Sequence, residues 1–536
     1  MKEYKILGLI AGAHSCGAAY MIGKNVVAVI EEERINRIKS YFDYEKDFER
    51  FPYDSLVTLI NRHGVQLNEI DYFTSFLPYE YIRNVLKGTV NFDLDESKFI
   101  RVDHHDSHAN LSYFLSGFEE DTLVFCADAS GANGYSSKTY VGSNGALTYK
   151  HGIPIQNKSM GHFYACLTEM VGFKRLKDEG KVVGLAGHGQ YWHDLYNVWQ
   201  DVVKIEGVNT DLDIHHVESG GIYLEMYRRF FQFVGSKYWK NKAAIEDMAF
   251  TGQKLFEDKI VELINNNHAK FPHCKKLALS GGIFANVKLN KVINELDWVE
   301  ELFVLPPMGD EGLAFGCAIA VSKQLHPDLK PFRTPMYLGN EFSQEEILSA
   351  GAGFNRKELD IEFIGELLLQ KKILGLYQGR SEHGARALGN RSIICDCTHE
   401  ETYKILNDKL QRNDYMPFAP VVLDEDVDFI FNVPKSRYTT EFMTLLVDTK
   451  EEWRDKIPTV VHPKDKTARI QIVTEKSNKL LHSILKMYKS HTGAGILVNT
   501  SFNVHNEPIV DKPEDAFAHL KSGIIDYLIT PYGIFY

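Results

Sequence analysis

The chain has 536 residues, of which 44% are hydrophobic and 25% charged, and its formal net charge is −12. Length and composition predict a globular protein of about two to four domains. No apolar run approaches the roughly 20 residues that a membrane span needs, so we expect no membrane segment. The negative charge argues against a surface coated for nucleic-acid binding, although a local basic cleft stays possible.

The cysteines and the N-terminal segment indicate a cytoplasmic protein. The seven cysteines are scattered and contain no C-x2-C pair, so we expect no disulfide framework. The first apolar segment runs into a glycine turn and His14, without the small-residue cleavage site of a signal peptide. We interpret this segment as the first β-strand.

Residues 5–34 and 121–152 look like a repeat. Each contains an apolar strand, a small-residue turn with one polar side chain, a second strand, a tight turn and a third strand. Two such meanders predict a duplicated actin-like (ASKHA) ATPase-type domain, in which the turns after the first strands face a shared cleft. Two unrelated hairpins are the alternative.

His104 and His108 stand four residues apart. On a helix this spacing puts both imidazoles on one face, where they can share a divalent metal, although structural histidine pairs have the same spacing. Asp128 and Asp310 follow predicted strands, where an actin-like cleft would gather them with the histidines and His14. Two histidines and one or two carboxylates suit iron(II) or another first-row metal acting as a Lewis acid. Capping of a turn or helix is the alternative role for each carboxylate.

The middle of the chain contains two candidate phosphate turns. Residues 160–270 are mostly helical in pattern, and residues 276–290 and 302–320 each read as strand, turn and helix. Backbone N–H groups at such helix starts can bind phosphate. Within the helical stretch, residues 228–242 interleave basic with aromatic side chains, which can hold a DNA backbone and stack bases. An amphipathic helix end with a solvated basic face is the alternative.

A proline-bearing stretch at 326–339 is typical of a linker, and Ser343 with Glu346 predicts a capping box that starts a new helix. We therefore predict one domain over 1–345 and a second over 346–536. Strands alternate with helical segments in the second part, which indicates another α/β domain.

The second domain carries a candidate anion pocket. Residues 379–392 hold three arginines and three glycines, and arginine grips phosphate and carboxylate in a bidentate manner. A solvated surface loop is the alternative. The candidate pocket residues are Arg380, Arg386, Arg391, Arg412, Arg469, Asn499 and Ser501.

Ten motifs run through nearly the whole chain in a specific order: AHSCGAA, EEERINRIK, HHDSHA, EGKVVGLAGHG, LSGGIFANVKLN, PPMGDEGLAFG, GRSEHGARALGNRS, MPFAPVVL, DKTARIQ and LVNTSFNVHNEPIV. In these motifs the chain resembles the NodU/CmcH family of ATP-dependent O-carbamoyltransferases. The resemblance implies an N-terminal actin-like domain, similar to the universal tRNA threonylcarbamoyltransferase, followed by a C-terminal YrdC-like α/β domain.

The resemblance also implies a two-step reaction. The YrdC-like domain would make carbamoyl adenylate from carbamoyl phosphate and Mg-ATP, releasing pyrophosphate. The intermediate would then reach the N-terminal cleft by a protected path, where the carbamoyl group passes to an acceptor hydroxyl. Family positions that line the first pocket match Arg386, Arg391, Arg412, Arg469, Asn499 and Ser501.

For the transfer site, the resemblance implies an iron(II) ion, although spacing alone does not separate iron from zinc or manganese. His14 matches the histidine that orients or deprotonates the acceptor hydroxyl, and Asp128 is assigned both a catalytic and a metal-binding role. The metal ligands match His104, His108, Asp128 and Asp310, and the nucleotide-contacting turn matches Gly281, Gly282 and Asn286.

The chain departs from the family at several positions. Many members carry Lys-x-Arg-x-x-x-Arg before PFAP, and here these positions are Leu410, Arg412 and Met416. Lys409 lies next to the missing lysine. Asn506 replaces a glycine that is common before EPIV, which indicates a local change in the turn.

The resemblance leaves the acceptor open. We expect a small molecule or sugar, and the alternative is the hydroxymethyl group of 5-hydroxymethylcytosine in phage DNA. In that alternative the protein would act in the cytoplasm of the phage host. A duplex base would have to be flipped or single-stranded. A non-catalytic nucleotide-binding relative is a further class, which the losses at Leu410 and Met416 would allow. A tRNA-modifying threonylcarbamoyl transferase is disfavoured by the fused arginine–glycine module at 379–392. The sequence sets no oligomeric state.

Overall fold

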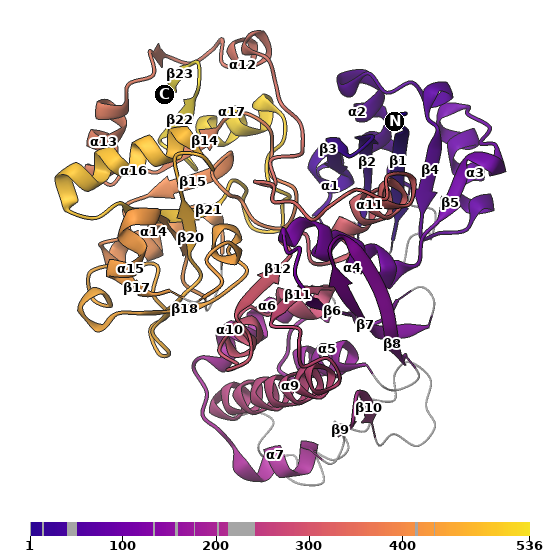
Figure 1. The fold of residues 1–536 in the computed structure, drawn as a ribbon. Helices are drawn as coiled ribbons and strands as arrows, with labels where there is room; N and C mark the ends of the chain where they lie inside the picture. The colour runs from indigo at the N-terminus through magenta and orange to yellow at the C-terminus, as the bar shows by residue number, and fades with distance from the viewer. Residues whose placement is uncertain are drawn as a thin grey trace.

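The computed structural model describes residues 2–12, 15–39, 51–131, 134–155, 159–175, 177–200, 203–212, 242–412, 416–433 and 435–536. It contains three α/β units, two in the N-terminal part and one in the C-terminal part (Figure 1). His14 and residues 228–241 of the basic and aromatic segment lie outside the described residues.

The first unit is built on a five-stranded sheet with the order β3-β2-β1-β4-β5. The first three strands are antiparallel neighbours, and β4 and β5 run parallel to β1. Their bounds are β1 (Lys5–Ala11), β2 (Cys16–Ile22), β3 (Asn25–Glu31), β4 (Tyr72–Ser75) and β5 (Phe99–Arg101). Helices α1 (Glu32–Asn36), α2 (Tyr53–His63) and α3 (Tyr79–Val90) belong to the same unit.

The second unit repeats this topology. Its sheet has the order β12-β11-β6-β7-β8, with β6, β7 and β8 antiparallel and β11 and β12 parallel to β6. Their bounds are β6 (Thr122–Ala127), β7 (Tyr135–Ser143), β8 (Ala146–Pro154), β11 (Lys276–Ser280) and β12 (Glu301–Val304). The same order and directions in both sheets confirm the predicted duplicated actin-like core. The reading as two unrelated hairpins is wrong.

Two helices lie between these sheets, α4 (His104–Ser116) and α11 (Leu313–Leu325) (Figure 1). Their apolar side chains share one buried cluster with strands of both units. The helices approach closely because Gly316 has no side chain: a Cβ there would lie 2.2 Å from the carbonyl oxygen of Ser107. A Cβ on Gly8 of β1 would likewise lie 2.1 Å from the carbonyl oxygen of Ala314.

The middle of the chain is mainly helical, as predicted. It contains α5 (Met160–Met170), α6 (Glu179–Ala186), α7 (His193–Gln200), α9 (Lys242–Lys270) and α10 (Val287–Asn294). A short antiparallel hairpin of β9 (Val203–Glu206) and β10 (Asn209–Leu212) interrupts these helices, which the sequence pattern did not predict.

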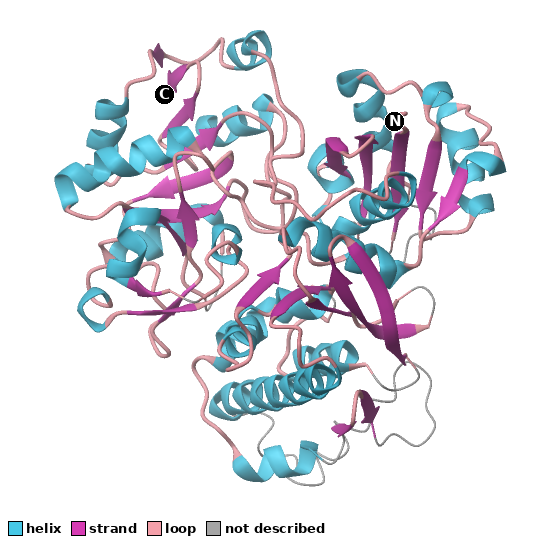
Figure 2. Cartoon of the chain, in the orientation of Figure 1, coloured by secondary structure: helices cyan, strands magenta, loops and turns pink. Residues whose placement is uncertain are grey.

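The C-terminal unit is a second α/β domain, as predicted. Its eight-stranded mixed sheet has the order β13-β23-β22-β14-β15-β21-β16-β20, and helices flank it (Figure 2). The strands are β13 (Arg356–Lys357), β14 (Leu374–Tyr377), β15 (Arg391–Cys395), β16 (Ala419–Leu423), β20 (Gln471–Val473), β21 (Ile496–Ser501), β22 (Tyr527–Thr530) and β23 (Gly533–Phe535). A small sheet is formed by β17 (Phe431–Asn432), β18 (Val447–Thr449) and β19 (Thr467–Ala468).

The helices of this unit are α12 (Gln344–Ala350), α13 (Ile361–Leu369), α14 (Glu400–Leu410), α15 (Asp424–Ile430), α16 (Lys479–Thr492) and α17 (Pro513–Lys521). The predicted capping box of Ser343 and Glu346 is present at the start of α12. The domain boundary that we predict at residue 345 therefore falls in the first turn of that helix. Among the described residues, no helix combines the length and the apolar character needed to cross a membrane.

Candidate functional site

Helix α4 carries the predicted histidine pair. Asp103 caps its N-terminus, because the carboxylate accepts the backbone N–H groups of His105 and Asp106 at 2.9 and 3.2 Å. His104 and His108 follow on one face of the helix, and both are buried. The cap fixes where the helix begins and therefore the direction in which these two imidazoles point.

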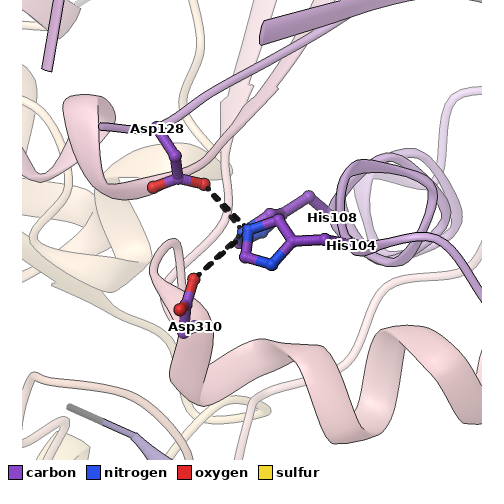
Figure 3. Close-up of side chains that lie close together, drawn as sticks. All are labelled: His104, His108, Asp128 and Asp310. Carbon is purple, nitrogen blue, oxygen red and sulfur yellow. Dashed lines mark ion pairs between the residues drawn. The ribbon is translucent and has the colours of Figure 1, made fainter. Parts of the chain in front are cut away.

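Two carboxylates meet these imidazoles from the turns after β6 and β12 (Figure 3). The Oδ2 atom of Asp128 lies 3.0 Å from Nε2 of His108 and 3.5 Å from Nε2 of His104. The Oδ1 atom of Asp310 lies 3.5 Å from Nε2 of His104 and 3.6 Å from Nε2 of His108. One donor atom from each of the four residues lies within 4.8 Å of the other three.

The donor set fits a divalent metal. Nε2 of His104, Nε2 of His108 and Oδ2 of Asp128 are buried and have no hydrogen-bond partner among the described residues. Buried polar atoms are normally satisfied, and a divalent ion at the point that these three atoms face would satisfy them. Two imidazoles and two carboxylates suit first-row metals.

The ionisable side chains of the site shift one another's pKa values. Burial disfavours the charged form of Asp128, but His108 and His104 outweigh this effect and hold the pKa of its carboxyl well below the usual range. Burial also opposes protonation of His108, yet Asp128 and Asp310 raise its pKa to about 10. His105 differs, because burial, followed by the neighbouring His104, lowers its pKa to about 3. His105 is therefore neutral at physiological pH.

The two predicted phosphate turns lie beside Asp128. The N–H group of Gly281 donates to the carbonyl of Met308 at 2.7 Å, so the turns contact each other. Gly281 has a φ of +103°, and a Cβ there would lie 2.1 Å from the carbonyl oxygen of Ala127. The N–H group of Gly282 donates to Oδ1 of Asp128. Asn286 caps α10 through the N–H group of Leu289 and also bonds Gln253. These contacts orient Asp128.

The arginines of the 379–392 loop have different environments. Arg380 donates to the backbone carbonyls of Gly339, Val27 and Leu338. Arg391 is fully buried, donates to the carbonyls of Gln378, Asn390, Asn340 and Gly379, and stacks on the Tyr377 ring. Both terminal nitrogens of Arg391 are therefore occupied, so its predicted contact with an anion would require a rearrangement.

Arg386 is placed differently from these two arginines. Burial, together with the charge of Arg412, lowers its pKa to about 10, and Glu311 acts in the opposite direction. Its Nε has no hydrogen-bond partner among the described residues. Two neighbouring guanidinium groups in a partly desolvated position are typical of a site that binds an anion.

Strand β21 carries two of the remaining candidates, Asn499 and Ser501, and Arg412 contacts the residue between them. Arg412 donates to Oγ1 of Thr500 at 3.3 Å, between Asn499 and Ser501 on that strand. The amide of Asn499 donates to Gln471, and its Oδ1 is buried without a partner among the described residues. Arg469 is half-buried just beyond β19.

The departures from the family pattern have clear structural settings. Leu410 is buried in the core of the C-terminal unit, and Lys409 pairs with Asp526 at 3.0 Å, so Lys409 does not take the place of the missing lysine. Met416 packs on α6 of the N-terminal part, where a Cβ on Gly184 would lie 2.5 Å from its Cγ. Asn506 has a φ of +68°, the left-handed conformation that glycine favours and asparagine tolerates.

Sequence reasoning missed a buried ionic cluster that joins the two domains. It consists of Glu31 and Arg34 from the N-terminal part and His383 from the arginine loop. The signal was a run of charged residues, EEER, directly after an apolar strand. Such a run is usually solvated, so its burial followed only from the tertiary structure.

Fold and site together define a protein built on a duplicated actin-like core, with a buried cluster of side chains that could hold a metal ion. Residues 78–319 match the family model described as carbamoyltransferase N-terminus, and residues 365–534 match the carbamoyltransferase C-terminus. The chain is 33% identical to an uncharacterized protein of Methanocaldococcus jannaschii over 91% of this chain and 83% of that protein. The chain belongs to the carbamoyltransferase family.

Two further relatives are nodulation proteins. The nodulation protein NolO of Bradyrhizobium diazoefficiens is 31% identical, over 80% of this chain and 78% of that protein. The nodulation protein NolNO of Sinorhizobium fredii is 29% identical, over 96% and 78%. Among solved structures, full-length HypF in its phosphate- and nucleotide-bound form matches with 14% identity and a TM-score of 0.37, over 61% of this chain and 48% of that chain. That structural likeness is too weak to support a conclusion about activity.

Proposed function

We propose that the chain is an ATP-dependent O-carbamoyltransferase that makes carbamoyl adenylate in its C-terminal domain and transfers the carbamoyl group in its N-terminal cleft. The observation that carries this proposal is the convergence of His104, His108, Asp128 and Asp310 between the two halves of the actin-like core. Family membership supports carbamoyl chemistry, and the neighbouring Arg386 and Arg412 support an anion pocket in the C-terminal domain.

His104, His108, Asp128 and Asp310 would hold the metal, which we propose to be iron(II) or another divalent ion. When bound, it supplies a Lewis acid that stabilises negative charge near the reacting carbamoyl group. The protein orients this site through the N–H group of Gly282, which fixes the second oxygen of Asp128. That hydrogen bond leaves Oδ2 free to face the imidazoles.

The first step consumes water, carbamoyl phosphate and Mg-ATP. Water cleaves carbamoyl phosphate to carbamate and inorganic phosphate. A carbamate oxygen then bonds to the α-phosphorus of Mg-ATP, and the bond from that phosphorus to pyrophosphate breaks. Arg386, Arg412 and Arg469, with Asn499 and Ser501, would bind the anionic groups, because guanidinium and amide donors favour phosphate oxygens.

In the transfer step the acceptor hydroxyl oxygen bonds to the carbamoyl carbon, and the bond from that carbon to AMP breaks. The hydroxyl proton passes to a general base, which we assign to His14 on the resemblance of its motif. The nucleotide would lie along Gly281, Gly282 and Asn286. We propose that the acceptor is a small molecule or sugar that carries a hydroxyl group.

The test combines Mg-ATP and carbamoyl phosphate with the purified protein. We expect pyrophosphate release that requires both substrates, and a gain of one carbamoyl group on the true acceptor by mass spectrometry. The panel contains sugars, aminoglycosides and hydroxymethylcytosine DNA. Intact ATP binding without pyrophosphate release would contradict the proposal and favour a non-catalytic nucleotide-binding protein.

The variant His14→Asn separates the two steps. Since His14 is assigned to transfer alone, the variant should keep pyrophosphate formation and lose carbamoylation of the acceptor. Loss of both activities in a folded variant would refute the division into two sites. Metal content, measured on the same sample, should stay at the level of the wild type.

A further inference from the structure

A buried ionic cluster ties the arginine loop to the N-terminal domain. The carboxylate oxygen Oε1 of Glu31, at the end of β3, lies 2.8 Å from Nδ1 of His383 and accepts the N–H group of Gly384 at 2.6 Å. Arg34 of α1 donates from Nε to the other oxygen of Glu31 at 3.2 Å and from Nη2 to the carbonyl of Gly384 at 2.6 Å. Three of these contacts join two adjacent loop residues to the first unit, and the fourth holds Arg34 against Glu31.

The cluster is buried and charged. Glu31, Arg34 and His383 are 8%, 4% and 1% exposed. Burial opposes ionisation of Glu31, but Arg34 and then His383 outweigh it and lower the pKa of its carboxyl to about 2. Because the Glu31 carboxylate accepts hydrogen bonds from Arg34 and from His383, the imidazole of His383 must carry a proton on Nδ1. Removing one partner of such a pair leaves a buried charge without compensation.

The same loop also touches the turn that carries a metal ligand. A Cβ on Gly384 would lie 3.1 Å from the backbone of Pro306 and Pro307, in the turn that leads to Asp310. The His383 ring meets Phe315 of α11 edge-on, with 6.4 Å between the ring centroids. Arg386, two positions after Gly384 in the loop, interacts electrostatically with Glu311, the residue after Asp310. The loop therefore reaches from the turn that carries Asp310 to the proposed anion pocket around Arg386.

We propose that His383 is a positioning residue that, held by Glu31 and beside Arg34, fixes the 379–392 loop between the two sites and keeps carbamoyl adenylate away from water. This inference rests on the proposed two-step function. When the anchor is removed, the loop loses its register against Pro306 and Pro307, and solvent reaches the intermediate. Water then bonds to the carbamoyl carbon, AMP leaves, and the resulting carbamic acid decomposes to carbon dioxide and ammonia.

Hydroxylamine tests this role without knowledge of the acceptor. It attacks the carbamoyl carbon of an accessible adenylate, giving hydroxyurea and releasing AMP. The protein is incubated with Mg-ATP, carbamoyl phosphate and hydroxylamine, and hydroxyurea is counted per pyrophosphate released. A blank without ATP subtracts the direct reaction with carbamoyl phosphate. We expect low trapping in the wild type and a several-fold higher ratio in His383→Ala.

Matched variants separate positioning from general damage. His383→Asn keeps an amide donor where the imidazole has Nδ1, so its ratio should return toward the wild-type value. Glu31→Gln preserves the shape of the acceptor but removes its charge, so it should raise the ratio and provides a second measurement if His383→Ala folds poorly. Lys486→Ala on α16 breaks a surface contact with Glu425 of α15, remote from the loop, and should leave the ratio unchanged.

The outcomes are distinct for the two proposals. Equal trapping in the wild type, His383→Ala and Glu31→Gln would overturn the positioning role while leaving the two-step function intact. A wild-type protein that binds ATP yet releases no pyrophosphate with carbamoyl phosphate would overturn the function itself. Higher trapping in both variants, with recovery in His383→Asn, supports the anchor.

Discussion

At the scale of single residues, three neighbouring histidines of α4 have separate roles. His104 and His108 face the two carboxylates, whereas His105 packs on Gly131, where a Cβ would lie 2.3 Å from its Cε1. Sequence spacing predicted the pair at i and i+4. Only the positions of Asp128 and Gly131 show which imidazoles share the site and which one packs elsewhere.

The different positions of His104, His108 and His105 predict which variants lose bound metal. His104→Ala and His108→Ala each remove one of four donors, so we expect at least a tenfold loss of affinity for a divalent metal, the scale of effect seen for metal-site residues. His105→Asn is the matched control from the same helix turn and should keep the metal of the wild type. Elemental analysis after gel filtration measures the bound ion. Equal metal in all four proteins would contradict the assignment.

The buried carboxyl of Glu441 should make the free energy of unfolding depend on pH. Burial raises the pKa of its carboxyl to about 7, against the opposing charge of Arg333. Because the folded-state pKa is raised, the folded form holds its proton between pH about 4.5 and 7 while the unfolded form loses it, so the free energy of unfolding falls as pH rises through this window. Glu441→Gln should remove that loss and stabilise the protein at pH 8 by about 1–3 kcal/mol after allowance for solvent screening.

Chemical denaturation at pH 4.5 and pH 8 measures this effect. The variant and the wild type should differ little at the lower pH, where the folded wild type holds the proton and the unfolded form holds it about half of the time. A constant difference at the two pH values would mean that Glu441 affects stability through packing and not through its charge.

At the scale of secondary-structure elements, the packing of α4 on α11 builds the candidate metal site. Helix α4 carries two ligands, and the turn before α11 carries Asp310. The sequence pattern predicted helix α11, the capping box of α12 and the glycine turn before α10, whereas for α4 it gave only the i and i+4 spacing of the histidines. It did not predict the β9–β10 hairpin, because both strands are short and β9 buries only Val203.

Gly316→Ala tests the link between this packing and the site. The added methyl group would overlap the carbonyl of Ser107, which lies between His104 and His108, so α4 and α11 must separate. We expect a destabilisation of roughly 1–3 kcal/mol, as for overpacked cores, together with weaker metal binding. Thermal unfolding and metal titration measure the two effects.

Gly88→Ala is the control for that substitution. Gly88 lies inside α3, is exposed, and would have nothing within 4 Å of its Cβ. Alanine there should stabilise the helix by about 0.5–1 kcal/mol and leave the metal unchanged. If Gly316→Ala behaved like Gly88→Ala, the close contact of α4 with α11 would not control the site.

At the scale of the whole molecule, arginines hold the domains together. Arg37 of the N-terminal part donates to the carbonyls of Ile509 and Pro508 at 2.6 and 2.8 Å, and Arg380 of the C-terminal part donates to Val27 at 2.7 Å. Together with the cluster of Glu31 and Arg34, these contacts make the interface polar and specific. We therefore expect the domains to unfold in one cooperative transition.

Arg37→Met tests this cooperativity. It keeps the aliphatic part of the side chain but removes both hydrogen bonds to the C-terminal domain, so the calorimetric transition should broaden or split into two. Arg83→Met is the control, because its partner Asp93 lies on the surface of the same unit, and it should keep one transition. A split transition in both variants, or in neither, would show that Arg37 does not couple the domains.

The sequence by itself determined the features that depend on neighbours along the chain. These are the repeated meanders, the i and i+4 spacing of His104 and His108, the cap of α12 and the arginines and glycines of the 379–392 loop. Each follows from local backbone geometry and from side-chain periodicity, which a short window contains. The family motifs added the expected chemistry to these positions.

The tertiary structure decided what long-range packing controls. Gly282 bonds Asp128 across 154 positions, and His383 meets Glu31 across 352. Such contacts depend on how whole sheets and helices bury their apolar faces against one another, which no local window contains. For the same reason only the fold showed that Arg391 is held by backbone carbonyls, that Leu410 belongs to the core, and that the arginine loop reaches the metal turn.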